Sequence, residues 1–239
     1  MHLFYTPDIS GSTYQLSESE SKHCIRVLRL KRGDEVRLVD GRGGRYSALV
    51  ESEDPRHCLL VVKEREQTAS DFPYYLHIGI APTKNMDRME WFLEKVTEIG
   101  VNEITPVICE RSERRELRVE RLERVVVAAM KQSLKSFLPV INDPLPFSKW
   151  ISTVQSGFRG IAHCMPGEKI SLWDINRVDE VCLAIGPEGD FTEDEVGLAL
   201  KSGFTGLDLG TSRLRTETAG VVAVHGIQMM NGIKNKTAP

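Results

Sequence analysis

Two glycine-containing loops near the C-terminal end of the chain carry the residues best suited to chemistry. They are residues 185–191, with the sequence IGPEGDF, and residues 209–219, with the sequence LGTSRLRTETA. Each follows a short apolar run and precedes a helical pattern. In an open parallel sheet this places both loops beyond the carboxyl ends of strands, where ligands bind. Glycines there allow backbone amides to approach a ligand closely, and Glu188 can accept a hydrogen bond from a hydroxyl or an amine.

The second loop places Arg213, Arg215 and Glu217 at the N-terminus of a helix. The helix dipole favours anions there, and Thr216 can cap the first turn. Arg215 is therefore a candidate to hold a phosphate or to stabilise negative charge on a base. Two simpler interpretations stay open, namely a local ion pair between Arg215 and Glu217 and a purely structural turn at the first loop. Neither loop has the lysine of a P-loop or the glycine spacing of a dinucleotide-binding loop.

Charge is distributed unevenly along the chain. The formal net charge is −3, yet residues 22–45 hold eight basic residues against three acidic ones. Such a patch can hold phosphates, although a solvated basic face without a partner is the alternative. A second charged run, residues 110–124, alternates in sign and predicts a helix surface whose charges pair with one another. The basic residues of the first run are Lys22, Arg26, Arg29, Lys31, Arg32, Arg37, Arg42 and Arg45.

Length and composition limit the class of protein. With 239 residues, 41% hydrophobic and 27% charged, the chain has the composition of a globular protein of one or two domains, which excludes disorder, collagen and coiled coil. No apolar run is long enough to span a membrane and no leader precedes the first residues, so we expect a cytoplasmic protein. The five cysteines are widely spaced without a Cys-x-x-Cys pair. They predict neither a disulfide framework nor a metal site, and each is expected to be a small buried hydrophobe.

The patterns in residues 1–70 predict a small β-barrel. Residues 35–39, 46–50 and 58–62 alternate between apolar and polar, and the glycines of residues 41–44 supply a hairpin connection. A capping box of Ser17 and Glu20 predicts one helix that interrupts the barrel. The polar residues 64–73 are expected to form a linker.

After this linker the pattern changes to that of an α/β domain, residues 74–239. Apolar runs alternate with helical patterns, which is typical of βαβ units and a largely parallel sheet. Gly100 is expected to end a first helix that begins near Met86, and Thr192 with Glu195 forms a capping box for a helix that ends at Gly203. A last helix is expected over residues 217–230. The apolar runs are residues 76–81, 104–109, 161–164, 181–185 and 207–209.

The order of these motifs resembles the RsmE type of SPOUT RNA methyltransferase, which methylates N3 of a uridine in 16S ribosomal RNA of the small subunit. The resemblance covers nearly the whole chain. It rests on His23 with residues 27–29, Gly33-Asp34, Asp40-Gly41, Lys84, Met89-Glu90, Lys95, residues 97–101, residues 110–112, Gln132-Ser133, Pro139, residues 186–189 and residues 214–219.

The resemblance implies a PUA-like barrel that helps to grip RNA, followed by an α/β domain with a deep C-terminal trefoil knot. It also implies a homodimer, and S-adenosylmethionine held mostly by backbone groups of the two loops. The cofactor-binding residues implied by position are Ile185, Gly186, Glu188, Gly189, Leu209, Gly210, Leu214 and Thr216. For RNA binding we expect Lys22, Arg26, Arg29, Lys31, Arg32, Arg42 and Arg45, together with Lys84 and Arg88 at the start of the first helix of the α/β domain.

Three positions depart from the family pattern. Asp190 stands where a second glycine is more common, so the backbone is less free and a charge is added near the cofactor. The arginine that usually stands two residues before Leu214 is replaced by Ser212, and Arg213 follows one residue later. Lys135 stands where arginine is more common, and lysine keeps the charge without the bidentate fork.

The expected reaction makes specific chemical demands. N3 of uracil is a weakly acidic imide, so it must lose its proton before or during attack on the sulfonium methyl group. Arg215 is the candidate to stabilise charge on a carbonyl oxygen, and Glu217 is either the general base or a residue that positions Arg215. No metal is required. Two alternative functions remain, a non-catalytic RNA-binding ribosome-assembly factor and a nucleotide hydrolase, although the chain lacks a phosphate-cradling lysine loop.

Overall fold

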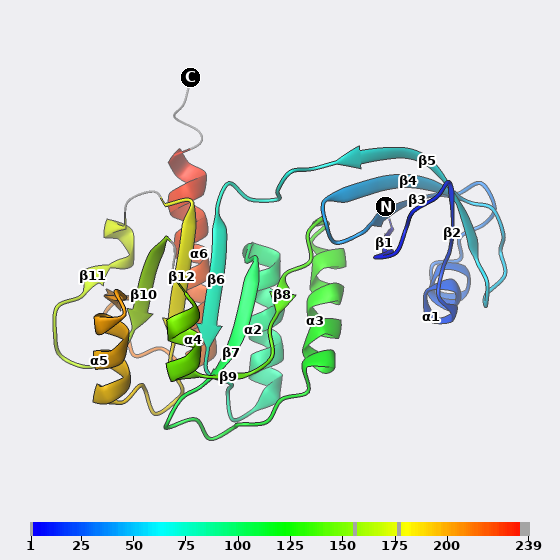
Figure 1. Cartoon of the computed structure of the whole chain (residues 1–239). Helices are drawn as coiled ribbons and strands as arrows, with labels where there is room; N and C mark the ends of the chain where they lie inside the picture. The colour runs from blue at the N-terminus through cyan, green and yellow to red at the C-terminus, as the bar shows by residue number, and fades with distance from the viewer. Residues whose placement is uncertain (1, 155–156, 176–177, 235–239) are drawn as a thin grey trace. The chain divides into compact units, whose positions relative to one another are not determined.

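The computed structural model describes residues 2–154, 157–175 and 178–234, and the chain folds into two compact units (Figure 1). The first unit comprises Met1–Asp71 with Met130–Leu138, and the second comprises Phe72–Ala129 with Pro139–Pro239. Residues 130–138, which the sequence analysis assigned to the second domain, therefore group with the first unit. Of the expected domain ranges 1–70 and 74–239, residues 1, 155–156, 176–177 and 235–239 lie outside the described residues.

The first unit is built on a five-stranded sheet with the strand order β1-β3-β4-β5-β2. β1 pairs with β3 in parallel, and the other pairs are antiparallel. Its core contains Phe4, Leu16, Val36, Leu38 and Leu60, all nearly fully buried. The strands are β1 (Leu3–Tyr5), β2 (Thr13–Gln15), β3 (Glu35–Val39), β4 (Gly44–Val50) and β5 (Leu59–Gln67).

The expected hairpin between β3 and β4 is present, and its turn is held by Asp40. The Asp40 carboxylate accepts hydrogen bonds from the N–H of Arg42 at 2.8 Å and of Gly44 at 2.9 Å. Gly43 has φ +92°, and a Cβ atom there would lie 2.4 Å from the carbonyl oxygen of Thr68, so only glycine fits. The expected linker over residues 64–73 was wrong at its start, because β5 continues to Gln67 by pairing with β4.

A helical segment interrupts the sheet where the Ser17 cap predicted it. Ser17 Oγ accepts a hydrogen bond from the N–H of Glu20 at 3.3 Å and begins α1 (Glu18–Lys22). The chain continues directly into a π-helical segment, η1 (His23–Val27). Arg29 then adopts φ +58°, an uncommon conformation for a residue with a Cβ atom. The basic patch of residues 22–45 thus begins on a helix and continues through an irregular segment into β3.

The carboxylate of Asp71 joins residues 130–138 to the rest of the first unit. It accepts hydrogen bonds from the N–H groups of Ser136 and Phe137, each at 2.8 Å, and from the Ser136 hydroxyl at 2.7 Å. It also pairs with Arg45 at 3.0 Å. Burial alone would raise the pKa of Asp71, but the hydrogen bonds and Arg45 hold it below its usual value.

The second unit is an α/β domain, which confirms the expected fold class at that level. Its sheet has the strand order β11-β13-β10-β12-β6-β7-β8, β9 pairs with β7 off this path, and every pair is parallel. The strands are β6 (Tyr75–Ile80), β7 (Glu103–Ile108), β8 (Val140–Ile141), β9 (Leu145–Pro146), β10 (Phe158–Ala162), β11 (Ile170–Ser171), β12 (Glu180–Ile185) and β13 (Thr205–Asp208).

Helices cover both faces of this sheet (Figure 1). α2 and α6 pack against each other, and α6 lies on β6 and β12. On the other face α4 packs against α5, where Phe147, Trp150 and Phe191 form a buried cluster with Cys182 and Ala184 of β12. The helices are α2 (Met86–Ile99), α3 (Val119–Gln132), α4 (Phe147–Thr153), the short η2 (Leu172–Asp174), α5 (Glu193–Lys201) and α6 (Thr216–Lys234).

Local signals explain the ends of two helices in this unit, α2 and α5. Asn85 caps α2 by accepting the N–H of Asp87, and Gly100 ends it with φ +140°. Thr192 and Glu195 form the complete capping box that the sequence predicted for α5. That helix ends at Lys201, two residues before Gly203, whose φ is +82°.

Two expectations about the surface were wrong. The alternating charges of residues 110–124 do not form one helix surface, because α3 begins only at Val119 and the preceding segment is irregular. Arg114 of that segment donates to the carbonyl oxygen of Lys84 at 3.0 Å instead of pairing along a helix. Cys164 is exposed, whereas the other four cysteines are buried as expected. No described helix has the length and apolar character needed to span a membrane.

Candidate functional site

Three loops at the carboxyl ends of neighbouring strands surround a cavity of about 760 Å³ in the second unit. They follow β10, β12 and β13, which lie next to one another in the sheet. Ligand sites in open parallel sheets occur at this edge. The cavity is lined by residues 162–164, Lys169, residues 185–188, Asp190, residues 207–216 and Ala219.

Most of the residues expected at the cofactor site line this cavity. Ile185, Gly186, Glu188, Leu209, Gly210, Leu214 and Thr216 do so, as does Arg215. Gly189 and Glu217 do not belong to the lining, although each adjoins a residue that does. The structure thus brings together the loops after β12 and β13, which are separated in the sequence by α5 and β13.

The loop after β12 is a tight turn held by its neighbours. Asp190 donates its N–H to the carbonyl oxygen of Pro187 at 2.9 Å and adopts φ +61°. Glu188 Oε1 accepts the backbone N–H of Lys84 at 2.9 Å, while its Oε2 is buried without a hydrogen-bond partner in the described part of the chain. A buried carboxylate oxygen without a donor costs free energy, which a hydrogen-bond donor of a ligand would offset.

Arg111 holds the same turn from the β7 side. One guanidinium nitrogen, Nη1, donates to the carbonyl oxygen of Gly189 at 2.9 Å and to that of Phe191 at 3.3 Å. These are the carbonyls on either side of Asp190. Arg111 belongs to the motif of residues 110–112, and its spacing in the sequence did not predict this contact with the turn.

The loop after β13 depends on Gly210 and Asp208. Gly210 has φ +117°, and its N–H donates to Asp208 Oδ1 at 2.9 Å. Thr216 was expected to cap the next helix, but α6 begins at Thr216 itself. Its hydroxyl donates instead to the carbonyl oxygen of Gly186 at 3.0 Å and so joins the loop after β12 to the start of α6.

The two candidate catalytic residues have different surroundings. Arg215 is exposed at the cavity, and its guanidinium has no hydrogen bond or ion pair among the described residues. Glu217 is only 6% exposed. Its Oε1 lies 3.7 Å from Nε of Arg88, and its Oε2 is buried without a partner in the described residues. The ion pair that we considered between Arg215 and Glu217 is therefore replaced by one between Arg88 and Glu217.

The third wall of the cavity was missed by the sequence analysis. His163 and Cys164 follow β10, and the apolar run over residues 161–164 placed them in a strand. Burial and the charge of Lys169 lower the pKa of His163, and Asp190 opposes this shift. Lys169 Nζ donates to the carbonyl oxygen of His163 at 3.0 Å. The position of this loop depends on β10 lying between β12 and β13, which no local signal reveals.

Family comparison identifies the two parts of the chain. Residues 70–228 match the model of an RNA methyltransferase domain, and residues 16–63 match that of an RNA methyltransferase PUA domain. The chain belongs to this RNA methyltransferase family.

Relatives of the family resemble the chain over nearly its full length. Ribosomal RNA small subunit methyltransferase E of Aquifex aeolicus is 30% identical, over 96% of this chain and 99% of that protein. A probable rRNA-methyltransferase from Porphyromonas gingivalis has a crystal structure with 42% identity and a TM-score of 0.93, covering 98% of this chain and all of the other. Ribosomal RNA small subunit methyltransferase E from Neisseria gonorrhoeae, solved with bound S-adenosyl methionine, is 27% identical with a TM-score of 0.88, covering 96% and 98%.

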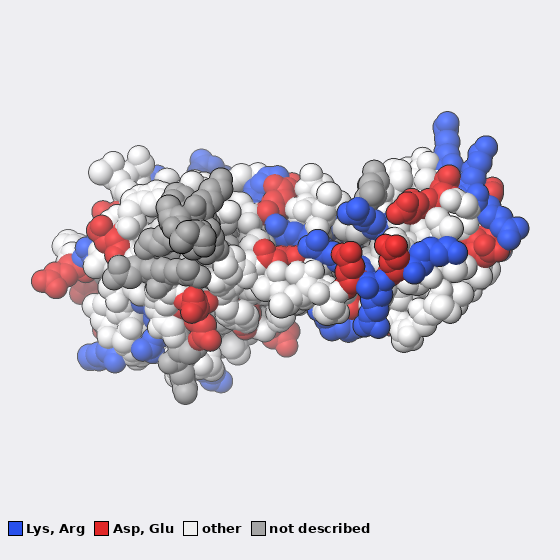
Figure 2. Space-filling model, turned by 90° about the horizontal axis from the view of Figure 1, so that it is seen from above, with Lys and Arg blue, Asp and Glu red and all other residues white. Residues whose placement is uncertain are grey.

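The basic residues expected to bind RNA in this methyltransferase fall into two groups. All seven in the first unit are exposed, but several are already engaged. On the face seen in Figure 2, Lys and Arg side chains lie interspersed with Asp and Glu side chains. Lys22 pairs with Glu18, Arg32 with Glu51 and Arg45 with Asp71, and Arg42 donates to the carbonyl oxygen of Pro7. The side chains of Arg26, Arg29 and Lys31 have no hydrogen bond or ion pair within the described residues.

Lys84 and Arg88 of the second unit are also engaged. Lys84 Nζ pairs with Glu113 at 2.8 Å and Arg88 with Glu217. Their position at the start of α2 is as expected, and their role in RNA binding stays a prediction.

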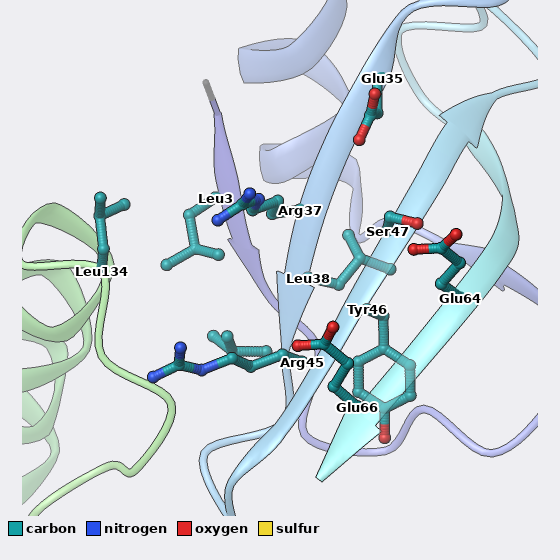
Figure 3. Close-up of a pocket in the computed structure, with 11 residues that line it drawn as sticks. Leu3, Glu35, Arg37, Leu38, Arg45, Tyr46, Ser47, Glu64, Glu66 and Leu134 are labelled. Atoms are coloured by element: carbon teal, nitrogen blue, oxygen red, sulfur yellow. The ribbon is translucent and has the colours of Figure 1, made fainter. Parts of the chain in front are cut away.

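A smaller hollow of about 180 Å³ lies on the sheet of the first unit (Figure 3). Arg37 and Arg45 project into it beside Glu35, Glu64 and Glu66. Its charges alternate across neighbouring strands, since Arg45 stands opposite Glu66 in the β4–β5 register. This arrangement is typical of a solvated sheet face and has none of the glycine loops of the larger cavity.

Proposed function

We propose that this protein transfers a methyl group from S-adenosylmethionine to N3 of a uridine in 16S ribosomal RNA of the small subunit. The proposal rests on one observation above all, the convergence of residues 185–190 and 207–216 on one cavity with Arg215 at its wall. Full-length similarity to ribosomal RNA small subunit methyltransferase E, including a relative solved with the cofactor, supports it.

The size and the residues of the cavity suit S-adenosylmethionine. The cavity volume of about 760 Å³ lies in the usual range for sites that hold cofactor-sized ligands. Gly210, with φ +117° and no atom near a hypothetical Cβ, lets a ligand approach the backbone, and the unpartnered Oε2 of Glu188 offers a buried acceptor. Ile185, Gly186, Leu209, Leu214 and Thr216 are proposed as further contacts, and Gly189 as a contact through the backbone of the same turn. The bound cofactor supplies an electrophilic methyl group on a sulfonium.

In the proposed mechanism Arg215 acts on the uracil. Loss of the N3 proton leaves negative charge that is shared with the two flanking carbonyl oxygens. A guanidinium without a protein partner at the cavity wall can donate hydrogen bonds to such an oxygen and lower the barrier to attack. Since methyl transfer requires mainly an in-line approach, much of the acceleration comes from holding the base in place.

Glu217 has two possible parts in the proposed mechanism. Its unpartnered Oε2 could accept the N3 proton, or the carboxylate could act only through its neighbours. Because Glu217 forms its ion pair with Arg88 and not with Arg215, a positioning role of Glu217 would act on Arg88. Replacement of Glu217 by Gln separates the two, because a general base is lost entirely while a positioning group keeps a hydrogen-bonding amide.

Further parts of the proposal concern RNA, assembly and topology. The PUA domain and the basic residues of the first unit supply a sequence-independent grip on RNA while the target base leaves its stack. We also propose a cytoplasmic homodimer, and a trefoil knot formed by the loops of the second unit.

The proposal is tested by transfer of labelled methyl from S-adenosylmethionine to small ribosomal subunits that lack the modification. We expect 3-methyluridine in nucleoside mass spectrometry of the product. Arg215→Ala should lower the rate about 100-fold with little change in cofactor affinity, and Arg215→Lys should retain part of the rate. The proposed methyltransferase activity would be overturned if neither subunits nor bare RNA were methylated and calorimetry showed no binding of the cofactor. The remaining function would then be that of a non-catalytic RNA-binding assembly factor.

A further inference from the structure

The loop after β10 is attached to the cofactor turn by one side chain. Asp190 Oδ2 accepts the backbone N–H of Cys164 at 2.9 Å, and Asp190 Oδ1 accepts the N–H of Phe191 at 2.8 Å. One carboxylate therefore joins the end of β10 to the turn after β12. Both Asp190 and Cys164 line the cavity of about 760 Å³.

The backbone of Asp190 is in a conformation that glycine adopts more readily. Its φ is +61°, and its N–H closes the turn onto the carbonyl oxygen of Pro187. Aspartate and asparagine tolerate this region better than other residues with a Cβ atom, at a small cost relative to glycine. Glycine at this position would keep the turn but would provide no acceptor for Cys164.

The contacts of the loop show why this acceptor matters. Residues 162–164 lie at the end of a strand, and Cys164 is exposed. Apart from the strand pairing of β10 and the Asp190 bond, one further hydrogen bond among the described residues restrains this loop. It is donated by Lys169 Nζ to the carbonyl oxygen of His163. The Asp190 bond is charge-assisted, so it is stronger than a hydrogen bond between neutral groups.

We propose that Asp190 is a positioning residue that fixes residues 162–164 as the third wall of the cofactor cavity and thereby sets the affinity for S-adenosylmethionine. The inference rests on the proposed function for the identity of the ligand. Asp190 acts through the Cys164 amide and requires no contact with the reacting atoms. A cavity wall that is already ordered before binding spares the ligand the cost of ordering it.

Two substitutions separate this role from a simple effect of charge. Asp190→Gly suits φ +61° and removes the acceptor, so loss of folding is not the expected result. Asp190→Asn also tolerates this φ and keeps one carbonyl oxygen for the Cys164 amide, but it removes the negative charge and the second oxygen, which accepts the N–H of the adjacent Phe191. Calorimetry with the full chain should show a dissociation constant for S-adenosylmethionine about fivefold higher in Asp190→Gly and within about twofold of wild type in Asp190→Asn. In methyl transfer, KM for the cofactor should follow these constants while kcat stays nearly unchanged.

Cys164 supplies a second measurement that does not depend on the cofactor. It is exposed, whereas Cys24, Cys58, Cys109 and Cys182 are buried, so a maleimide should react first with Cys164. Its alkylation, followed by peptide mass spectrometry, should be faster in Asp190→Gly than in wild type and nearly unchanged in Asp190→Asn. The thermal unfolding midpoint of each variant shows whether the difference is local.

The outcomes are distinguishable from failure of the proposed function. If wild type does not bind S-adenosylmethionine, that function is overturned, and the alkylation rates still decide whether Asp190 holds the loop. If wild type binds and Asp190→Gly binds equally well with an unchanged alkylation rate, the positioning role is overturned. Equal losses in both variants would also overturn it, because charge alone would then account for the effect.

Discussion

The hydroxyl of Thr216 donates a hydrogen bond to the carbonyl oxygen of Gly186 at 3.0 Å, across thirty residues of chain. Both residues are buried, and both line the cavity. This bond joins the turn after β12 to the start of α6, the helix that follows the second cofactor loop. It therefore links the two loops directly.

Replacement of Thr216 by Val is expected to weaken both folding and cofactor binding. Valine has nearly the same shape but no donor, so the buried carbonyl of Gly186 loses its partner at a cost of about 1–3 kcal/mol. Urea unfolding and calorimetric titration with S-adenosylmethionine measure the two effects. Thr216→Ser keeps the hydroxyl and serves as control. A Thr216→Val variant that unfolds and binds the cofactor no worse than Thr216→Ser would mean that the hydrogen bond contributes nothing at this position.

Arg111 is expected to support the turn of residues 186–190 without touching the ligand. Its Nη1 donates to the carbonyl oxygens of Gly189 and Phe191. Arg111→Lys keeps the charge, but its ammonium nitrogen lies one bond closer to the backbone than Nη1, so it should raise the dissociation constant for S-adenosylmethionine nearly as much as Arg111→Ala. Arg118, on the same charged run and exposed, provides the matched control as Arg118→Ala. Full rescue of binding by lysine would show that charge alone is needed.

Asp71 is expected to stabilise the first unit in a pH-dependent manner. Burial would raise the pKa of Asp71, but the donors of Ser136 and Phe137 and the charge of Arg45 lower it below the ordinary 3.8. A group with a lowered pKa in the folded state contributes stability that is fully present above 3.8 and is lost as the pH falls through the folded pKa.

Asp71→Asn should therefore cost about 1–3 kcal/mol at neutral pH, because it removes a charge and places an amide opposite donors. Urea unfolding of wild type and variant at several pH values measures the difference, which should shrink below pH 3.8. Asp143→Asn, at an exposed position, is the control. A difference that stays constant down to the acid range would mean that the carboxylate charge contributes nothing.

The basic residues of the first unit are expected to differ in their effect on RNA binding. Arg29 and Lys31 are exposed without a side-chain partner in the described residues, whereas Lys22 is paired with Glu18 at 2.6 Å. Each phosphate contact that is lost should reduce the magnitude of the slope of log affinity against log salt by about 0.7 to 0.9. Arg29→Ala and Lys31→Ala should each show this reduction in filter binding with small-subunit RNA, and Lys22→Ala should show less. Identical slopes for wild type and all variants would remove this patch from the RNA interface.

Local patterns along the chain were sufficient to predict much of the architecture. Apolar runs of strand length alternate with helical periods, and the caps at Ser17 and Thr192 act over three residues, so both can be recognised without tertiary structure. The two loops that line the cavity were likewise visible, because glycines and charged residues follow apolar runs. The prediction that Thr216 caps its helix was wrong, because its hydroxyl donates a hydrogen bond to the distant carbonyl oxygen of Gly186.

The strand order of the sheet determined parts of the site that local patterns did not predict. β10 lies between β12 and β13, and this arrangement brings His163 and Cys164 to the cavity as its third wall. Arg111 reaches Gly189 from the segment after β7, and Arg88 reaches Glu217 through the packing of α2 against α6, so both contacts join segments far apart in the chain. Parallel pairing places residues together by their position in the sheet and not by their distance in sequence. Composition and motif spacing therefore determined which residues can do the chemistry, and the packing of the sheet determined which of them meet.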